Sequence, residues 1–411
     1  MNLIEELKSR KILNNISNSE KFLKLDPKTT GVYVGFDPTA ESLHLGNYIL
    51  ISVLQRFAKA GFKTYALIGG ATGMIGDPSF KDAERVLLDQ AKVVNNKNHI
   101  KSQLESFGFQ IIDNYDFYKN MNILDFLRNT GKLINISYMT AKESVQKRID
   151  KGLSFTEFTY QLLQGADFLH AYKNLGIKVQ LGGSDQWGNI TTGLDMINKV
   201  EGDNHQAVGI TANLLTDENG QKIGKSTGGG ALWLNKNMCS PYKMYQYLLS
   251  QPDSRIADLL YWFSFENISK IDEIVKKHFE NPSSQIAQIA LADEVVKNIF
   301  GEDELKQAQN ITKILFDKNF DIKSLKLSDL SIIEKYLPMC KIKKNDLLVD
   351  SLIKQGIIQS NREARELIQS KALKIDNADI DMETKYEPKN FSGKYAFFKK
   401  GKKQVFLIKT F

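Results

Sequence analysis

The sequence contains little cysteine, little proline and no long apolar stretch. Only two cysteines, Cys239 and Cys340, occur in 411 residues, and they form no Cys-x-x-Cys pair. This pattern argues against a disulfide framework and against a zinc-binding cysteine cluster, and a reducing cytoplasm is the simplest setting. No apolar run approaches the length of a membrane span. Residues 1–13 mix acidic and basic side chains and lack the apolar stretch of a signal peptide.

The rest of the composition is that of a globular protein with a sizeable core. Hydrophobic residues make up 42% of the chain and charged residues 25%, and the 8 prolines are too few for a long disordered tract. A chain of 411 residues exceeds the usual size of one domain, so we expect two or three folding units.

The net charge of +7 is unevenly distributed. Residues 345–411 carry 13 Lys and Arg against 9 Asp and Glu, which places +4 of the net charge in the C-terminal part. A basic terminal unit suits a phosphate-rich partner such as a nucleic acid. A solvated basic surface would give the same count, so charge alone does not decide between these interpretations.

The first half of the chain alternates between strand and helix patterns. Residues 31–38 read GVYVGFDP, an apolar run that an Asp-Pro turn signal ends. Further strands are expected at residues 63–69 and 177–181, a strand or turn at 109–118, and helices at about 50–57, 83–107, 155–174 and 187–199. Such alternation predicts an α/β fold with a Rossmann-like parallel sheet and helices on both faces.

After about residue 230 the pattern becomes helical without intervening strands. Five helices are expected, at residues 242–249, 256–263, 271–279, 286–300 and 304–316. Residues 394–409 alternate around a Lys-Lys-Gly-Lys-Lys turn, as a basic β-hairpin would. We therefore expect four parts: an α/β domain at 1–229, an α-helical domain at 230–316, a linker at 317–344 and a small α+β domain at 345–411.

The segment from Asp37 to Asn47 carries the first candidate site. It links the first expected strand to the following helix, and open α/β sheets bind ligands beyond the carboxyl ends of their strands. The N–H groups at the start of a helix suit an anion, Thr39 and His44 add donors, and Gly46 allows a flat ring to approach the backbone. Taken alone, the segment is equally well explained as a turn with a capping histidine.

A glycine-rich loop with two lysines forms the second candidate site. Lys222 and Lys225 lie three residues apart within QKIGKSTGGG, which suits a mobile clamp on phosphates. The loop is not a Walker A motif, because Gly220 and Gly224 enclose three residues rather than four and a polar turn, not a strand, precedes them. Taken alone, it would be interpreted as an exposed basic loop.

The third candidate site is LGGSDQWGN at residues 181–189. It combines two glycines with Asp185 at the place where a strand passes into a helix. An aspartate there can accept hydrogen bonds from ribose hydroxyls, as in dinucleotide-binding folds. The structural alternative is a glycine turn whose aspartate caps the helix.

Together the three motifs are far more specific than each alone. Their order resembles that of class I aminoacyl-tRNA synthetases, with HLGN similar to the HIGH signature and KIGKS similar to the KMSKS signature. The segments YVGFDPTAESLHLGN, GGATGMIGDPS, SYMTAKESVQKRI, FTEFTYQLLQGADF and LGGSDQWGNI closely resemble bacterial tyrosyl-tRNA synthetases, and the segment from about Leu347 resembles their S4-like RNA-binding domain. The resemblance covers nearly the whole chain. Asn47 replaces the second histidine of HIGH and Gly224 the serine of KMSKS, and each departure removes one side-chain contact.

The resemblance implies a tyrosine–tRNA ligase. Tyrosine and ATP would form tyrosyl-adenylate and pyrophosphate, and the tyrosyl group would then pass to a terminal ribose hydroxyl of tRNA(Tyr). The first step demands orientation and stabilisation of charge on the departing pyrophosphate. The residues implied for this catalytic role are Thr39, His44, Lys222 and Lys225. Those implied for ATP binding are Gly35, Asp37, Gly46, Asn47, Gly183, Asp185, Lys225 and Ser226.

The resemblance also implies where tyrosine binds. Its ammonium group needs an anion and neutral acceptors, its carboxylate needs a donor, and its phenol needs paired polar groups in an apolar slot. For the ammonium group the resemblance implies Asp77, Tyr160, Gln164 and Gln180. For the carboxylate it implies Gln186, and for the phenol it implies Tyr33 and Asp167. Tyr160, Gln164 and Asp167 follow each other at helical spacing, so one helix face can present all three. A site built around a hydroxyl leaves its polar groups unpaired when phenylalanine enters.

The remaining expectations follow from the same resemblance. Mg²⁺ is expected to arrive with ATP, and no protein-bound metal is expected because the chain shows no cluster of metal ligands. A cytoplasmic homodimer without a membrane partner is expected from the family. The candidates for tRNA contacts are Arg362, Arg365, Lys399, Lys400, Lys402 and Lys403.

Three other functions are compatible with parts of the pattern. A tryptophanyl enzyme shares the architecture and both signatures, but Tyr33 and Asp167 argue against it. A small-molecule nucleotidyltransferase can carry a motif similar to HxGH, but the KIGKS loop and the basic C-terminal part argue against it. The third alternative is a synthetase-like RNA-binding module without catalysis, against which the full set of site residues argues.

Overall fold

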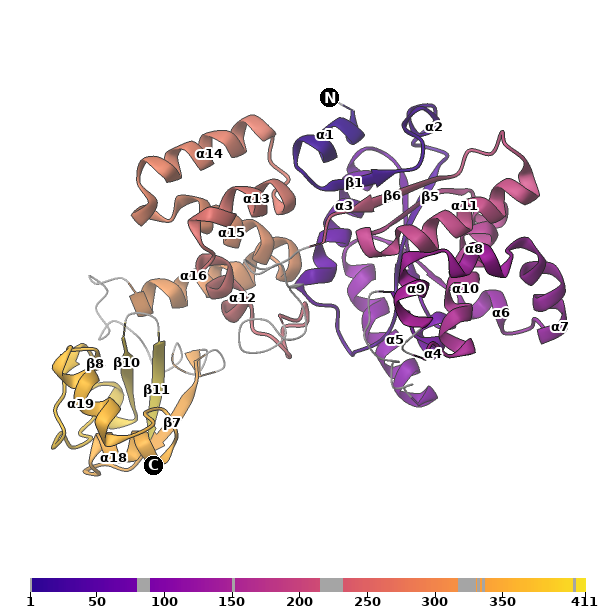
Figure 1. Ribbon diagram of the computed structural model, residues 1–411. Coiled ribbons are helices and arrows are strands. Elements are labelled where there is room, and N and C mark those ends of the chain that lie inside the picture. Colours follow the sequence, from indigo (N-terminus) through magenta and orange to yellow (C-terminus); the bar gives the residue numbers. More distant parts are fainter. Residues whose placement is uncertain are drawn as a thin grey trace. The chain divides into compact units, whose positions relative to one another are not determined.

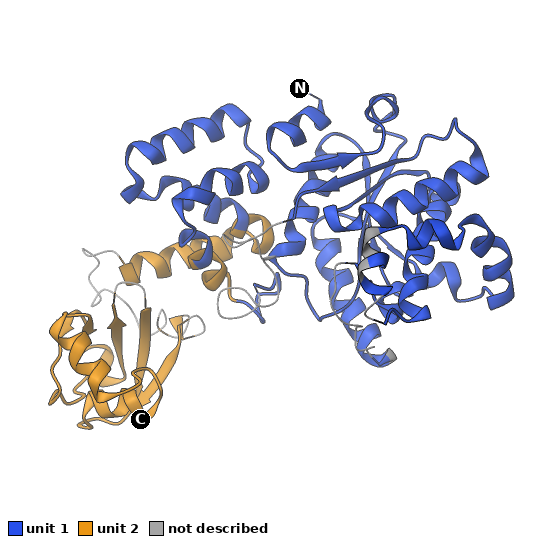
Figure 2. Cartoon of the chain, viewed as in Figure 1, with its two compact units in different colours: residues 1–239, 247–295 blue, residues 240–246, 296–411 orange. Residues whose placement is uncertain are grey.

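The computed structural model describes residues 2–79, 89–149, 152–214, 232–316, 330, 333–334, 337–401 and 404–411. The chain divides into two compact units (Figure 2). One comprises residues 1–239 and 247–295, and the other comprises residues 240–246 and 296–411.

A six-stranded sheet forms the centre of the first unit (Figure 1). In spatial order its strands are β1 (Leu13–Ile16), β6 (Val208–Ala212), β5 (Ile177–Gly183), β2 (Gly31–Phe36), β3 (Lys63–Ile68) and β4 (Gln110–Asp113). All neighbours from β6 to β4 pair in parallel, and β1 pairs antiparallel with β6 at the edge. The expected α/β fold is confirmed, and the antiparallel edge strand is an addition that the apolar pattern did not predict.

Helices cover both faces of this sheet. α3 (Leu45–Lys59) and α5 (Gln90–Ser106) connect β2, β3 and β4, while α10 (Phe155–Leu175) and α11 (Trp187–Glu201) flank β5. From β2 the chain moves outward to β3 and β4, and from β5 it moves outward in the opposite direction to β6. Because crossovers between parallel strands are right-handed, the two pairs of helices lie on opposite faces of the sheet. Tyr33, Phe168 and Ile197 belong to the apolar core beneath α10 and α11. The order reverses between β2 and β5, and ligands bind at such a point.

Short helices fill the connections of the first unit. They are α1 (Leu3–Ser9), α2 (Ser19–Leu23), α4 (Thr72–Ile75), α6 (Tyr115–Tyr118), α7 (Ile123–Asp125), α8 (Ile136–Thr140) and α9 (Glu143–Ile149). A π-helical turn, Phe126–Thr130, follows α7, and 3₁₀ turns follow at Gly131–Leu133 and at Ser184–Gln186.

Five consecutive helices follow the sheet. They are α12 (Pro241–Leu249), α13 (Asp253–Phe263), α14 (Ile268–Glu280), α15 (Ile286–Phe300) and α16 (Glu302–Phe316). All five lie where the sequence predicted helices, with ends shifted by no more than about one turn, and residues 232–316 contain no strand. The boundary between the compact units passes through α12 and α15, so the division at residues 230 and 316 stays a prediction. No helix in the described ranges is long and apolar enough to cross a membrane.

Two buried arginines fix the C-terminal end of α3. Arg56, in its last turn, donates to the carbonyl oxygen of Ser264 directly after α13 (2.6 Å) and to Glu6 Oε1 (3.0 Å). Arg10 donates to the same two residues. Carbonyl groups at the C-terminal end of a helix lack intrahelical partners. The two guanidinium groups satisfy the Ser264 carbonyl at the end of α13, and they hold α1, α3 and α13 together. Because α3 begins directly after His44, this clamp also fixes the helix that carries the HLGN motif.

The second unit contains a five-stranded sheet. Its order is β7 (Met339–Ile342), β11 (Gln404–Thr410), β10 (Tyr395–Lys400), β8 (Leu373–Ile375) and β9 (Ala378–Asp379). α18 (Leu348–Lys354) and α19 (Asn361–Gln369) share with this sheet a core that includes Leu352, Ala364 and Phe398. The expected hairpin is confirmed as β10 and β11. β7 lies in the range expected as linker and pairs in parallel with β11, so the small sheet begins before residue 345.

Candidate active site

Polar segments follow the carboxyl ends of four parallel strands. Asp37 follows β2, residues 69–72 follow β3, Asn114 follows β4, and the turn Ser184–Gln186 follows β5. The carboxyl ends of parallel strands share one edge of a sheet, so these segments converge there. The described residues that the sequence assigned to ATP and tyrosine lie on these strands, in the segments after them, or on α3 and α10, except Asp77, which follows the short helix α4.

Tyr33 and Asp167 lie close together in the core beneath α10. Tyr33 is 1% exposed and Asp167 is 2% exposed. Burial, and then the neighbouring Asp167 charge, raise the pKa of the Tyr33 hydroxyl well above its ordinary value. Among the described residues this hydroxyl has no hydrogen-bond partner, and neither has Oε1 of Gln180, which pairs in register with Tyr33. Buried polar atoms without partners beside a carboxylate are complementary to a further hydroxyl group.

Asp167 accepts hydrogen bonds from two protein donors. Asn114 Nδ2 donates to Oδ2 (2.9 Å), and the Tyr118 hydroxyl donates to Oδ1 (2.6 Å). Burial raises the pKa of the Asp167 carboxyl to about 7, although both hydrogen bonds act in the opposite direction. Each carboxylate oxygen retains acceptor capacity, so Asp167 can also accept a bond from a ligand hydroxyl.

Asn114 extends this network to the end of β2. Its Nδ2 lies 3.2 Å from Thr72 Oγ1, and its Oδ1 accepts from the backbone N–H of Ala71 (2.7 Å). Thr72 Oγ1 donates to Asp37 Oδ1 (2.8 Å), and the Tyr160 hydroxyl donates to Asp37 Oδ2 (2.9 Å). Both carboxylate oxygens of Asp37 thus accept bonds from protein hydroxyls, one of them from Tyr160. The assignment of Asp37 to ATP stays a prediction.

A second network joins three residues assigned to the amino acid. Gln186 Nε2 donates to Asp77 Oδ2 (2.8 Å), and Asn189 Nδ2 lies 3.0 Å from Gln164 Oε1 and 3.2 Å from Gln186 Oε1. Asp77 Oδ1 also accepts from the backbone N–H of Ser79 (2.9 Å). The network therefore holds a carboxylate and two amides in fixed orientations, which is what recognition of an ammonium and a carboxylate group requires.

Glycines shape the edge of the sheet where the nucleotide is expected. Gly35 is the one exposed residue of β2, and a Cβ added there would meet no described atom within 4 Å. At the end of β5, a Cβ on Gly183 would lie 2.6 Å from Asp185 Oδ1. After β3, a Cβ on Gly69 would lie 2.0 Å from Asp37 Oδ1, so only glycine leaves this carboxylate in place. Exposed backbone at Gly35 can receive a flat ring.

The HLGN motif forms the start of α3. His44 is the N-cap residue, Gly46 and Asn47 lie in the first turn, and Asn47 Oδ1 accepts the backbone N–H of His44 (3.0 Å). Thr39 lies half-buried in the preceding loop, and the His44 ring lies 6.2 Å from the ring of Trp233. The side chain of Asn47 thus stabilises the turn that presents His44.

Both flanks of the KIGKS segment lie at this edge. The Leu45 N–H donates to the carbonyl of Leu232 (2.8 Å), which follows the segment. Leu214, which precedes it, lies so near Gly183 that a Cβ there would meet Leu214 at 2.8 Å. The catalytic and ATP-binding candidates Lys222, Lys225 and Ser226 themselves lie outside the described residues. Positions 214 and 232 therefore lie beside two segments that the sequence assigned to ATP.

Thr72, Asn114 and Tyr118 belong to the first network, although no motif in the sequence assigned them to it. A signal was present, because Asn114 directly follows the last residue of β4, and polar residues at that end of a parallel strand are candidates for a site. The pattern of residues 109–118 fits either a strand or a turn, so it does not define the end of β4 and does not identify Asn114.

The described residues among those assigned to tRNA lie on α19 and β10. Arg362 and Arg365 are exposed on α19. Lys399 on β10 is half-buried, and burial lowers the pKa of its ammonium group. Lys400 is 18% exposed and pairs with Glu363 (2.7 Å), so it ties β10 to α19. Lys402 and Lys403 lie outside the described residues.

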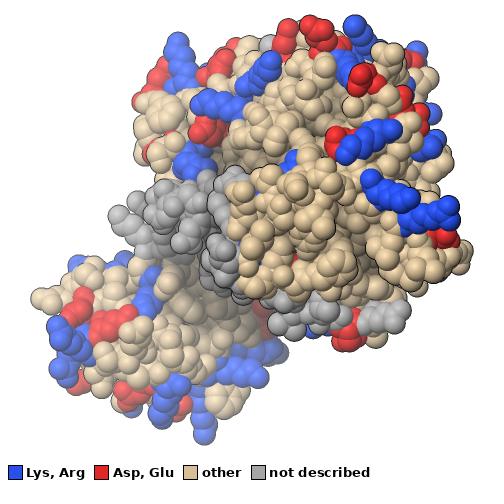
Figure 3. Space-filling model, turned by 45° about the vertical axis from the view of Figure 1, so that its right-hand side comes forward, with Lys and Arg blue, Asp and Glu red and all other residues tan. Residues whose placement is uncertain are grey.

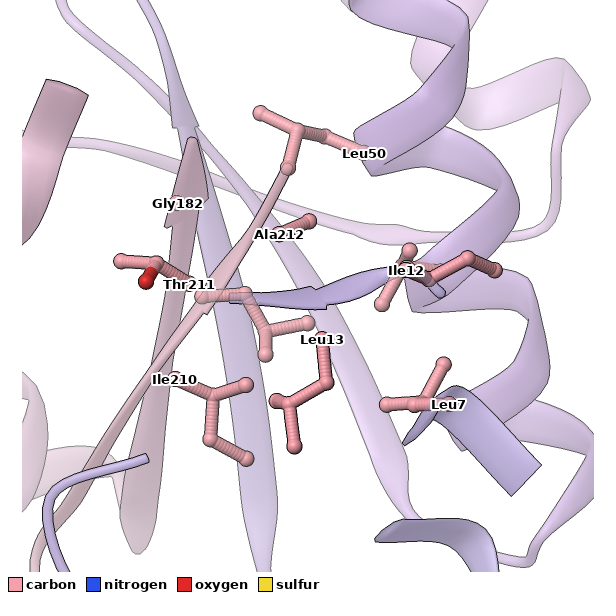
Figure 4. A pocket seen from close by; sticks show the side chains of 10 residues that line it. Leu7, Ile12, Leu13, Leu50, Gly182, Ile210, Thr211 and Ala212 are labelled. Atoms are coloured by element: carbon pink, nitrogen blue, oxygen red, sulfur yellow. The ribbon is translucent and has the colours of Figure 1, made fainter. Parts of the chain in front are cut away.

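The first unit also contains a small cavity among β1, β5, β6 and α3 (Figure 4), where Leu13, Leu50 and Ile210 are among the lining residues. Its walls are almost entirely apolar, so it suits neither a nucleotide nor an amino acid and is a packing void. In the described part of the chain, no group of three His, Cys, Asp or Glu side chains could hold a metal ion.

The chain is similar to known proteins over nearly its whole length. Residues 26–317 match the family described as tRNA synthetases class I (W and Y), and residues 329–408 match the tyrosine–tRNA ligase SYY-like C-terminal domain. A curated tyrosine–tRNA ligase of Mycoplasmopsis agalactiae is 71% identical over 100% of both chains, and that of Mycoplasmopsis synoviae is 53% identical over 99% of both. The crystal structure of a C-terminally truncated mitochondrial tyrosyl-tRNA synthetase of Aspergillus nidulans has a TM-score of 0.70 at 29% identity, covering 76% of this chain and 94% of that one.

Proposed function

Because this chain belongs to the class I aminoacyl-tRNA synthetases for tyrosine, we propose how its residues divide the labour of tyrosine–tRNA ligation. The enzyme activates tyrosine with ATP and loads it onto tRNA, and the tryptophan-specific alternative is not supported by the names of its full-length relatives. The observation that carries the tyrosine site is the buried pair of Tyr33 and Asp167. Loading of labelled tyrosine onto tRNA(Tyr) by the purified full chain tests the function as a whole.

We propose that Asp167 and Tyr33 bind the phenol of the substrate. The ionised Asp167 accepts the phenol O–H, and the Tyr33 hydroxyl, which has no described partner, donates to the phenol oxygen. Phenylalanine would leave the Tyr33 hydroxyl and one Asp167 acceptor site unpaired in the core. The pair therefore selects for a hydroxyl rather than only for a ring.

At the other end of the amino acid, Asp77 with Tyr160, Gln164 and Gln180 binds the ammonium group, and Gln186 binds the carboxylate. The hydrogen bond from Gln186 to Asp77 and that from Tyr160 to Asp37 support this arrangement, because they fix the donors and acceptors before the substrate arrives. A carboxylate held in one orientation can attack the α-phosphorus of ATP without a large loss of freedom.

In the activation step, a carboxylate oxygen of tyrosine forms a bond to the α-phosphorus while the bond to the leaving pyrophosphate breaks. We propose that Thr39 and His44 stabilise the charge that develops on the pyrophosphate, with Lys222 and Lys225 from the KIGKS segment. The pairing of Leu232 with Leu45 supports this proposal, since it anchors one flank of that segment at the HLGN motif. Gly35, Asp37, Gly46, Asn47, Gly183, Asp185, Lys225 and Ser226 form the proposed ATP site, and Mg²⁺ enters with the nucleotide.

The proposed division of the chain follows these roles. Residues 1–229 activate the amino acid, the helical part at 230–316 lies on the anticodon side, residues 317–344 link it to the rest, and residues 345–411 bind tRNA. Arg362, Arg365, Lys399, Lys402 and Lys403 are the proposed phosphate contacts, and Lys400 contributes less because its charge is paired with Glu363. We also propose a reducing compartment such as the cytoplasm, in which Cys239 and Cys340 remain thiols.

We further propose that the enzyme is a homodimer that associates through the first unit. Large apolar side chains are exposed between β4 and the first residue of α10: Ile123 is 66% exposed, Leu124 73%, Ile136 71% and Phe155 76%. Figure 3 turns this side of the unit forward and shows a broad area without charged side chains. Exposed apolar patches of this kind mark protein interfaces. Because a homodimer is expected from the family, we propose that a second copy of the chain binds this patch.

Replacing Leu124 by aspartate should therefore convert the enzyme to a monomer. A charge at the centre of an apolar interface has no partner and costs several kcal/mol, on the order of 10²- to 10³-fold in the dimer dissociation constant. Sedimentation equilibrium measures the mass directly. Phe279→Asp is the matched control, because Phe279 is 53% exposed but lies on α14; a monomeric control variant, or a monomeric wild type, would contradict the assignment.

A further inference from the structure

Tyr118 carries a hydroxyl at the tyrosine site that makes no direct contact with the substrate in the proposed function. This residue, at the end of α6, donates to Asp167 Oδ1 (2.6 Å) and also lies 3.0 Å from the carbonyl oxygen of Leu163. Tyr118 is half-buried, and burial, and then the charge of Asp167, raise the pKa of its hydroxyl well above the ordinary value. The hydroxyl is therefore a neutral donor near neutral pH.

Packing holds this donor in place. The Tyr118 ring lies edge-on to Phe126 (centroids 6.1 Å apart) and to Phe117 (6.4 Å). The aromatic contacts leave the ring little freedom to turn its hydroxyl away. Asn114 occupies the other carboxylate oxygen at the same time. Asp167 is thus fixed from both sides by uncharged donors.

Among the residues that the structure describes, those that face Asp167 carry no positive charge. Tyr33 on β2 and Asp37, which follows β2 and carries a like charge, face Asp167 on one side. Tyr118 on α6 and Asn114, directly before α6, face it on the other. It forms no ion pair with a described residue. Burial disfavours the charged carboxylate, and hydrogen bonds from Asn114 and Tyr118 are the described interactions that oppose it.

We propose that Tyr118 is a positioning residue for tyrosine selection, whose hydroxyl keeps Asp167 ionised and oriented to accept the substrate phenol. The inference rests on the proposed role of Asp167. It adds a third hydroxyl to the recognition of tyrosine, one that acts on the substrate only through the carboxylate. Without it, protonated Asp167 would offer the phenol a neutral and weaker partner.

The proposal predicts a change in the pH profile of Tyr118→Phe. With one donor fewer, the pKa of Asp167 rises above its present value of about 7, so the ionised form is populated only at higher pH. In pyrophosphate exchange from pH 6 to 8.5, the rise of kcat/KM for tyrosine, which reports the free enzyme, should move upward by about one pH unit. At pH 7 the loss should be about fivefold and reside mainly in KM, and at pH 8.5 the variant should approach the wild type.

Two controls keep the outcome decisive. Tyr115→Phe removes a hydroxyl from the same short helix, where Tyr115 is 37% exposed, and should leave the profile unchanged. A Tyr118→Phe variant that loses activity equally at all pH values, or whose profile superimposes on the wild type, overturns the proposal. Asp167→Asn separates this failure from that of the proposed function: if that variant still prefers tyrosine over phenylalanine as the wild type does, Asp167 itself has been misassigned.

Discussion

Replacing Asp167 by asparagine should lower kcat/KM for tyrosine by on the order of 10- to 150-fold while leaving the weak reaction with phenylalanine nearly unchanged. Asparagine preserves shape and an acceptor but removes the charge, and a hydrogen bond to a charged group stabilises by about 1.5–3 kcal/mol. Because phenylalanine has no hydroxyl to form this bond, the ratio of the two kcat/KM values should fall by nearly the same factor. Pyrophosphate exchange with each amino acid measures it.

The pH dependence provides a second readout of the same variant. In the wild type the pKa of Asp167 is raised to about 7, and the ionised form is the better acceptor, so kcat/KM for tyrosine should rise as pH increases through 7. Asparagine does not titrate, and this rise should vanish. Asp116→Asn, an exposed residue of α6 paired with Lys119, is the control and should behave like the wild type. A decrease that is the same for tyrosine and phenylalanine would show that Asp167 serves folding rather than selection.

A chain that ends at Phe316 should still form tyrosyl-adenylate but should charge tRNA at least about a hundredfold more slowly. All residues proposed for the chemistry precede position 227, and the cut falls between α16 and the C-terminal sheet. Residues 345–411 hold +4 of the net charge of +7, so the truncated chain loses most of its attraction for phosphates. Pyrophosphate exchange and tRNA charging, measured on the same preparation, separate the two steps.

A variant with three substitutions tests the role of the positive charge without removing the C-terminal sheet. Replacing Lys399, Lys402 and Lys403 by alanine removes proposed phosphate contacts and leaves the pair of Lys400 with Glu363, which ties β10 to α19, intact. The slope of log affinity for tRNA against log salt should decrease by up to about 0.9 for each phosphate that the variant no longer neutralises, with pyrophosphate exchange unchanged. Full-rate charging by the truncated chain would show that the C-terminal sheet has another role.

Much of the fold could be predicted because local patterns are strong where elements are buried. β2 and α10 carry continuous or periodic apolar residues, and both lie where the sequence predicted them. β1 escaped prediction because LNNI is short and half polar, as an edge strand can be. β7 was not predicted because its partner β11 lies more than sixty residues away in the sequence, so no local pattern indicates that the two strands pair.

The site residues also differ in whether a local sequence pattern or a contact between distant segments defines them. Tyr160, Gln164 and Asp167 could be placed on one helix by their spacing, and each contacts a polar residue of another element in the structure. Thr72 and Asn114 could not be assigned, because their contacts depend on how α4, β4 and α10 come together in space. Likewise, the pair that Lys400 forms with Glu363 cannot be inferred from the local sequence KKGKK, since Glu363 lies on a separate helix.

Tyrosine specificity is tested most directly by pyrophosphate exchange of the full-length enzyme with tyrosine, phenylalanine and tryptophan offered separately. The buried Asp167 and the Tyr33 hydroxyl are satisfied together only by a ligand with a phenol. We expect exchange that depends on tyrosine, with kcat/KM for phenylalanine and for tryptophan lower by at least about a hundredfold. Exchange with either of them at a rate equal to that with tyrosine would contradict the assignment.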